Sequence, residues 1–349
     1  MTTRRNFLAA AVAAAGAVAL APVARAGTVL QAAAGAKIAV PGTGIGIGLD
    51  AKAFAASRRY VATSFGDIAW VERGGDTGIG RDAQPVALFL HGFPLNGFQW
   101  RDAIALLSPY RRCIAPDFMA LGHTRPRPGQ ALDPDAQAAM LVAFLDALGI
   151  GAVDIVASDS GGAIAQLLMV RHPHRVRSLL LANCDTEHEC PPAAMLPVIE
   201  LSRQGRYADA WLGEWLRDKA LARSAEGIGG MCYADPSNPD DEAITAYFAP
   251  VLASEERKAL LHAYAIALER NALAGIGQAL RASRVPVRTV WGMADGIFSP
   301  QGADYLERVP GNSRGVRRLP DAKLFWPEER PGTIAEEALA LWNAGGASA

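Results

Sequence analysis

The segment Val153–Ala165 reads VDIVASDSGGAIA. A short apolar run at its start ends in polar residues set among small ones, and a helix-forming run follows. This order predicts a strand, a tight turn and a helix, and it matches the nucleophile elbow, in which a strained turn lifts one side chain at the end of a central strand. Asp159 stands at the apex. A carboxylate there predicts attack at carbon through an alkyl-ester intermediate rather than acyl transfer.

Ser160 competes with Asp159 for the apex. An elbow needs small residues just before and after its apex because the helix returns close to the strand, and both registers meet this need. With Asp159 at the apex, the bulky Ile155 and Val156 fall at the end of the expected strand, so we favour Asp159. An ordinary N-cap aspartate opening a helix is the weaker alternative because other segments of the chain agree with an elbow.

The composition is that of an ordinary globular protein. The chain has 349 residues, of which 50% are hydrophobic, and a formal net charge of -1. This near-neutral balance gives no electrostatic reason to expect nucleic acid or acidic lipid as a partner. We find no cofactor motif, and the four cysteines lack the spacing of a zinc site.

The first 26 residues are expected to be an export signal. Thr3–Leu8 reads TRRNFL, which is the twin-arginine pattern. The apolar run that follows, from Ala9 to about Pro22, is shorter than the ~20 residues of a spanning helix, and Ala24-Arg25-Ala26 is a small-x-small cleavage site. We predict cleavage after Ala26 and a periplasmic or secreted protein in a bacterium, without membrane attachment; an uncleaved N-terminal anchor is the alternative.

The rest of the chain divides into a lead-in, a core and a cap. Residues 27–57 are rich in Ala and Gly and are expected to be poorly ordered. Residues 58–186 and 283–349 alternate strands with helices, which predicts an α/β core with a mostly parallel sheet covered on both faces. Residues 187–282 contain helices without a buried strand. Inserted after the sixth strand, they would form a helical cap over the crevice where ligands bind.

Four segments carry a resemblance to a known family. They are His91-Gly92-Phe93-Pro94 with Trp100-Arg101, Ala115-Pro116-Asp117 with Gly122, the elbow, and Gly292-Met293-Ala294-Asp295. The chain from about Arg59 to Trp342 resembles the α/β-hydrolase superfamily, most of all the branch of epoxide hydrolases, haloalkane dehalogenases and fluoroacetate dehalogenases. The resemblance implies an α/β-hydrolase fold and a hydrolase of the Asp-nucleophile type that acts on a small hydrophobic epoxide or halogenated compound.

The resemblance also implies roles for single residues. Asp159 would be the nucleophile, and the backbone N–H groups of Phe93 and Ser160 would form the oxyanion hole. Asp295 would be the acid of the triad, because it follows a buried strand. Asp185, after the preceding strand, is the second candidate for that acid.

The base that the family uses is missing. A histidine normally follows the last strand, and here Phe325 and Glu328-Glu329-Arg330-Pro331 anchor an alignment that puts Leu324 at its position. A leucine cannot take a proton from water. Lys323 beside it is the substitute base that we consider, if burial lowers its pKa. The histidines elsewhere in the chain are weaker candidates: His91, His123, His172, His174, His188 and His262.

Residues at the elbow, in the oxyanion segment and in the cap bear on whether the substrate is a halogenated compound or an epoxide. Haloalkane dehalogenases often hold halide with Asn at the Phe93 position and Trp at the Ser160 position, and both are absent here. Epoxide hydrolases use cap tyrosines to protonate the epoxide oxygen, and the cap offers Tyr207, Tyr233, Tyr247 and Tyr264. Cys184 and Cys190 are close enough in sequence to pair in an oxidising periplasm, or they stay free.

Three functions therefore remain open. The first is the Asp-nucleophile hydrolase with a substitute base. The second is a diverged member of the fold that stops at a covalent ester, catalyses a lyase or isomerase step, or only binds a small molecule. The third is an esterase that uses Ser160, which a missing base disfavours most because serine needs one to become a nucleophile.

Overall fold

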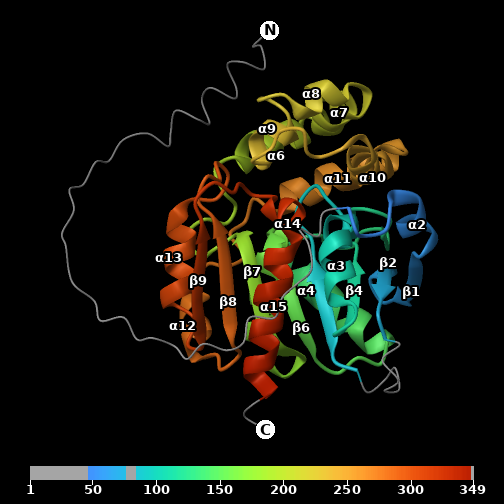
Figure 1. The fold of residues 1–349 in the computed structure, drawn as a ribbon. Helices are drawn as coiled ribbons and strands as arrows, with labels where there is room; N and C mark the ends of the chain where they lie inside the picture. Colours follow the sequence, from blue (N-terminus) through green and yellow to red (C-terminus); the bar gives the residue numbers. More distant parts are fainter. Residues whose placement is uncertain (1–45, 76–83, 347–349) are drawn as a thin grey trace, which may run out of the picture.

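A computed structural model describes residues 46–75 and 84–346. The predicted export signal and the first part of the lead-in lie outside these residues. Within them, the sheet strands follow the order β1-β2-β4-β3-β6-β7-β8-β9, and a two-residue strand, β5, pairs with β2. β1, β2 and β5 run antiparallel to their neighbours and the remaining pairs are parallel. The predicted α/β-hydrolase architecture is confirmed (Figure 1).

The strand bounds are as follows: β1 Arg59–Thr63, β2 Gly66–Arg73, β3 Val86–Leu90, β4 Arg112–Pro116, β5 Arg125–Pro126, β6 Val153–Asp159, β7 Val176–Cys184, β8 Val287–Gly292 and β9 Ser313–Leu319. β3 and β6 are buried along their whole length. Such strands read as continuous apolar runs because helices cover both faces of a parallel sheet. The carboxyl ends of β6, β7 and β8 meet at one edge, where the elbow, Asp185 and Asp295 follow.

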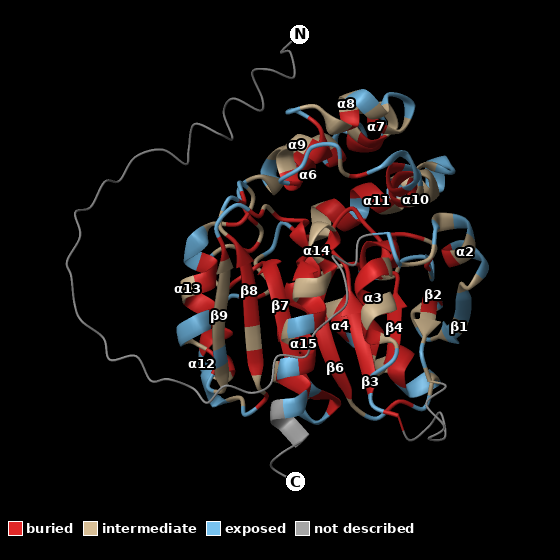
Figure 2. Ribbon diagram, viewed as in Figure 1, coloured by how far each residue is buried: buried red, intermediate tan, exposed pale blue. Residues whose placement is uncertain are grey.

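Helices cover both faces of the sheet. α3 (Arg101–Leu107) and α15 (Pro331–Gly346) pack on one face, and α4 (Pro134–Ala147), α5 (Ser160–Arg171) and α13 (Pro300–Arg308) pack on the other. α4 begins where Pro134 occupies its first turn and the Asp133 side chain accepts from the Ala136 amide, which is an N-cap. Buried residues thus fill two layers between helices and sheet, as Figure 2 shows in red.

The cap lies above the carboxyl ends of the strands (Figure 1). It contains α6 (Met195–Arg203), a π-helical turn at Ala208–Gly213, α7 (Glu214–Arg217), α8 (Lys219–Arg223), α9 (Ile228–Cys232), α10 (Asp241–Leu252) and α11 (Glu255–Ala267). α12 (Gly277–Ala282) differs from our prediction, because it packs on the core beside α5 and its Leu280 carbonyl accepts from the Gly311 amide. The helical cap therefore ends before residue 277 rather than at 282.

The lead-in is ordered at its end, contrary to our expectation. Residues Ala51–Ala56 form helix α2, whose N-cap Asp50 accepts from the Ala53 amide. Phe54 on this helix is buried and its ring meets that of Phe98 edge to face at 5.2 Å. Burial of the Phe54 ring stabilises this helix, although the local sequence pattern for a helix is weak. Among the described residues, no helix is both long and apolar enough to cross a membrane.

Candidate active site

The elbow has the geometry of a strained turn, with Asp159 at its apex. Asp159 has φ 55° and ψ -139°, while Ser160 already begins helix α5. A non-glycine residue with positive φ costs on the order of 1–3 kcal/mol, and such strain is found where the surroundings over-determine it. The backbone therefore supports the register with Asp159, and not Ser160, at the apex.

Two glycines make this turn possible. A Cβ on Gly92 would lie 2.2 Å from the Cβ of Asp159, and one on Gly162 would lie 2.3 Å from the Cβ of Cys184. Atoms cannot approach so closely, so any side chain at either position would displace the elbow. These contacts explain why small residues flank the apex and why glycine precedes Phe93.

Two backbone amides point at the Asp159 carboxylate. The amide of Phe93 donates to Oδ1 at 3.2 Å, and the amide of Ser160 donates to the same oxygen. These are the two donors that we expect for an oxyanion hole. Burial raises the pKa of Asp159 to about 6, while the two amides act in the opposite direction. At neutral pH the side chain is thus mostly a carboxylate, which is the form that can attack carbon.

This pKa leads to a first prediction. Formation of an ester on Asp159 should be slow at pH 5 and should rise through pH 6 to a plateau near pH 7–8, because the neutral acid is a poor nucleophile. Single-turnover experiments across this pH range, in which adduct formation is followed by intact mass, would measure this pH dependence. A rate that stays constant from pH 5 to 8 would contradict the assignment of Asp159 as the titrating group.

Both candidate acids are buried beside the elbow. Burial raises the pKa of Asp295 to about 7, although it accepts from the Ile297 amide at 2.8 Å and from Asn183 Nδ2 at 2.8 Å. Burial and the charge of Asp159 raise the pKa of Asp185 well above its usual range. Burial is the largest cause at both residues and favours the neutral acid at each. The structure keeps both Asp295 and Asp185 as candidates for the acid.

Asn183 is a site residue that the sequence analysis missed. Its amide group holds Asp295 and also exchanges hydrogen bonds with the backbone of Gly292, at 2.6 and 2.9 Å. Its Oδ1 accepts from Trp326 Nε1 at 3.0 Å. Asn183 thereby fixes the end of β8 and the carboxylate after it. The available signal was a polar residue at the end of an apolar strand.

Leu324, which our alignment places at the position of the usual base, is buried. The loop before it lies against the loop of Asp295, since the Ala294 amide donates to the Ala322 carbonyl at 3.0 Å. Lys323 donates from Nζ to the carbonyl of Gly230 in α9, at 2.6 Å. The contact turns the Lys323 Nζ toward the backbone of the cap helix α9. This contact argues against Lys323 as the substitute base.

Two of the histidines that we considered as substitute bases accept hydrogen bonds from the backbone. His91 accepts from the Phe118 amide through Nε2 at 3.1 Å, and His262 accepts from the Ala208 amide through Nε2 at 3.0 Å. Burial lowers the pKa of both. No hydrogen bond joins any of the six histidines to Asp159, Asp185 or Asp295 in this part of the chain.

The four cap tyrosines separate into two pairs. Tyr207 and Tyr264 stack on the ring of Phe93, with centroids 5.8 and 5.7 Å away, and the charge of Asp159 acts on both. The hydroxyl groups of Tyr264 and Ser160 are buried near Asp159, and the Ser160 side chain acts against burial on the pKa of both Tyr264 and Asp159. Among residues 46–75 and 84–346, neither hydroxyl makes a hydrogen bond of good geometry. A buried hydroxyl without such a bond is costly, and a bound molecule could accept a hydrogen bond from either one.

The second pair of tyrosines holds Glu328, whose carboxylate is buried between cap and core. Tyr233 donates to Oε1 at 2.6 Å, Tyr247 donates to Oε2 at 2.8 Å, and Arg101 donates to Oε2 at 2.8 Å. Burial raises the pKa of Glu328 despite these three donors. We call these four residues the Glu328 cluster. The cluster joins the Trp100-Arg101 segment to the segment that begins at Glu328, because Arg101 donates to the Glu328 carboxylate.

The cysteines are free thiols in the structure. Cys184 and Cys190, for which we left pairing open, are both buried and unpaired, as are Cys113 and Cys232. Burial raises the pKa of all four thiols. Among the described residues, no group of three or more His, Cys, Asp or Glu side chains could hold a metal ion.

Known proteins share this fold and this arrangement of segments. A family model for the alpha/beta hydrolase fold matches residues 85–323. Haloalkane dehalogenase 2 of Mycobacterium tuberculosis is 27% identical over 281 residues, which cover 79% of this chain and 92% of that protein. The crystal structure of an ancestral haloalkane dehalogenase aligns with a TM-score of 0.65 at 26% identity, over 83% of this chain and all of that one. Epoxide hydrolase CorEH aligns with a TM-score of 0.65 at 19% identity, covering 82% and 98%, which shows a shared fold.

Proposed function

The chain belongs to the alpha/beta hydrolase fold family, and from that membership we propose that Asp159 opens a small hydrophobic epoxide to form a hydroxyalkyl ester. The observation that carries the proposal is the pairing of an aspartate at the strained apex with a nearby buried tyrosine hydroxyl that makes no hydrogen bond of good geometry within the described residues. Neither ester hydrolysis by Ser160 nor displacement of a halide by Asp159 would need a proton from that tyrosine.

The proposed step balances as follows. An oxygen of Asp159 attacks an epoxide carbon, the carbon–oxygen bond of the ring breaks, and its electron pair passes to the epoxide oxygen. That oxygen takes the proton of Tyr264, whose raised pKa keeps the phenol protonated until an alkoxide forms. Tyr207, which also stacks on Phe93, would orient the same oxygen. The aromatic rings around Phe93 supply apolar contacts for the rest of the substrate.

Alkyl halides are the second candidate class, and the dehalogenase relatives favour them. The same carboxylate would attack carbon, and a halide ion would leave with the bonding electrons. Such an ion needs N–H donors, whereas Phe93 offers an apolar ring and Ser160 a hydroxyl. The side chains at these two positions therefore favour an epoxide over a halide.

Intact-mass spectrometry separates the candidate reactions. An epoxide adds its whole mass to the protein, because ring opening loses no atoms. An alkyl halide adds its mass less that of the hydrogen halide. Acylation of Ser160 by an ester would add only the acyl group and would vanish in Ser160→Ala. Peptide mapping of the adduct to Asp159 would support the proposal, and a panel of epoxides that yields neither adduct nor diol would refute it.

The role of Tyr264 gives a second prediction. Tyr264→Phe should slow the formation of an epoxide adduct by roughly 10²-fold, because general-acid help is typically worth 10²–10⁴-fold. An alkyl halide needs no acid, so any adduct with it should form at an unchanged rate. Tyr247→Phe is the matched control, since Tyr247 faces Glu328 instead of Asp159, and it should affect both reagents alike. Equal slowing of both reagents by Tyr264→Phe would argue against an acid.

A further inference from the structure

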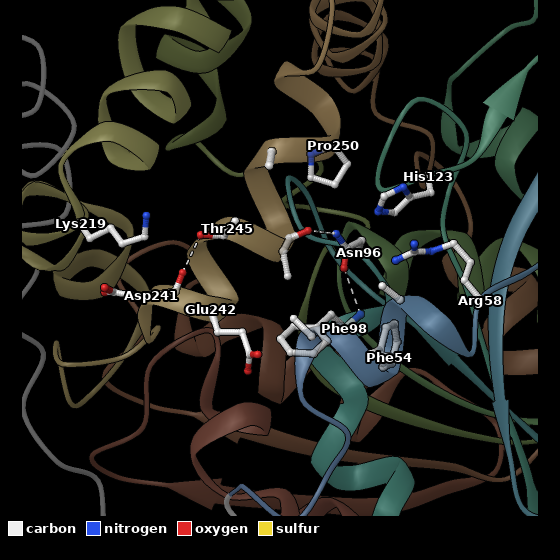
Figure 3. A pocket seen from close by; sticks show the side chains of 14 residues that line it. Phe54, Arg58, Asn96, Phe98, His123, Lys219, Asp241, Glu242, Thr245 and Pro250 are labelled. Carbon is white, nitrogen blue, oxygen red and sulfur yellow. Dashed lines mark hydrogen bonds between the residues drawn. The ribbon is translucent and has the colours of Figure 1, made fainter.

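A cleft of about 480 Å³ lies between α2 and the cap helix α10, and none of its lining residues is Asp159, Phe93 or Tyr264 (Figure 3). Its floor is apolar, with the rings of Phe54 and Phe98 and the small side chains of α10. Pockets of 300–1,000 Å³ with mostly apolar walls and a few polar groups are typical small-molecule sites. The cleft is thus a second candidate binding site, distinct from the elbow.

Two polar side chains with unused hydrogen-bonding groups stand at one end of this cleft. Arg58 directly follows Ser57, the C-cap of α2, and His123 lies in the loop after β4. Figure 3 shows these two side chains next to each other. Neither side chain has a hydrogen bond or ion pair within residues 46–75 and 84–346. Arg257 nearby is different, because its guanidinium donates to the carbonyls of Gly122 and Thr124, at 2.7 and 2.8 Å. Arg58 is therefore the cation that remains available to a ligand.

The charges around His123 make this end of the cleft positive. Arg58, Arg125 and Arg257 face it against the single carboxylate of Asp117. Burial, followed by these arginines, lowers the pKa of His123 to about 4, so the imidazole is neutral at pH 7. The three arginines carry more charge than Asp117 neutralises, and Arg58 has no side-chain partner among the described residues. An anionic group of a ligand would neutralise the positive charge at this end of the cleft.

The opposite end of the cleft offers no such preference. Lys219, Asp241 and Glu242 line it, so charges of both signs are present. Asp241 pairs with Arg223, and Lys219 donates from Nζ to the Leu216 carbonyl at 3.2 Å. A ligand with one anionic end is therefore oriented by Arg58, and its apolar part lies toward the middle of the cleft.

We propose that this cleft binds a small amphipathic carboxylate, with its carboxylate on Arg58 and His123 and its hydrocarbon part on Phe54 and Phe98. The planar guanidinium can donate two parallel hydrogen bonds to a carboxylate, and the imidazole supplies a third donor. The two aromatic rings supply the surface that a hydrocarbon chain would bury. Because α2 belongs to the core side and α10 to the cap, the ligand would bridge the two.

Octanoate is the probe that we would use, with acetate and 1-octanol as partial analogues. Calorimetry on the full chain should show octanoate binding at least roughly tenfold tighter than either analogue, since acetate lacks the apolar chain and octanol lacks the charge. In proton NMR, octanoate should raise the midpoint of the His123 titration by about one pH unit or more, because a nearby negative charge favours the imidazolium. This second readout is local to the cleft.

Variants make the test specific. Arg58→Gln should weaken octanoate binding roughly tenfold, as expected for the loss of a charged hydrogen-bond donor. Lys52→Gln removes the same charge from an exposed position on the adjacent helix α2 and should leave the affinity unchanged. Asp159→Asn should also leave it unchanged, which separates this cleft from the elbow. Circular dichroism would show that each variant is folded.

Three results would overturn the proposal. Equal affinity for octanol and octanoate would mean that the cleft does not recognise an anion. A His123 titration that octanoate leaves unmoved would place the ligand elsewhere, as would loss of binding in Asp159→Asn. Acetate that binds as tightly as octanoate would show that the apolar floor contributes nothing.

Discussion

Asp159→Asn should abolish formation of the covalent ester and any turnover that depends on it. An amide nitrogen carries no charge and is a poor nucleophile, and removal of a catalytic nucleophile typically costs on the order of 10⁴–10⁶-fold in rate. The amides of Phe93 and Ser160, which now face a carboxylate oxygen, could still face the amide oxygen. The turn geometry should therefore survive the substitution, and the effect should be on chemistry alone.

The measurement is adduct mass and diol formation with an epoxide that labels the wild-type protein. Ser160→Ala is the matched control, because it alters the neighbouring residue of the same turn but leaves the carboxylate and the backbone donors in place. We expect labelling of Ser160→Ala to remain within about tenfold of the wild-type rate. Labelling that persists in Asp159→Asn but disappears in Ser160→Ala would reverse the assignment of the nucleophile.

Leu324→His should raise hydrolysis of the ester by roughly 10²–10⁴-fold, the usual worth of general-base help. Among residues 46–75 and 84–346 no imidazole makes a hydrogen bond to Asp159, Asp185 or Asp295, so we expect the ester on Asp159 to accumulate and to decay slowly. A histidine at residue 324 would follow the loop that already lies against the loop of Asp295.

Pre-formed ester gives a direct measurement, because its decay can be followed by intact mass after excess epoxide is removed. Leu324→Gln is the control, since glutamine is polar and of similar size but is not a base in this pH range. The rate should increase in the histidine variant only. If the ester of the wild-type protein decays as fast as that of Leu324→His, another group already activates water, and the importance that we give to Leu324 is wrong.

The elbow could be predicted from sequence because its determinants are local. An apolar strand, an acidic apex and small residues on both sides lie within the segment from Val153 to Ala165, and the strain at Asp159 follows from that order. The alternation of strands and helices in residues 58–186 and 283–349 was predictable for the same reason. Their burial patterns repeat within one element and need no knowledge of the rest of the chain.

The features that the sequence could not reveal depend on contacts between distant segments. Asn183 acts through Gly292, Asp295 and Trp326, which are more than 100 residues away along the chain. Lys323 faces the cap because its partner is the Gly230 carbonyl. The last helix of the expected cap, α12, packs on the core for a similar reason. No periodicity in a single segment encodes such partners.

The Glu328 cluster has a consequence for how molecules enter the site. If the cap lifted as a rigid body, the carboxylate of Glu328 would keep Arg101 but lose the hydrogen bonds from Tyr233 and Tyr247, each typically worth about 1.5–3 kcal/mol to a charged group. An open form would then make up on the order of one molecule in 10² to 10³ or fewer. Substrate exchange should therefore proceed through side-chain motions beneath a cap that stays in place, and molecular width would decide which compounds are admitted.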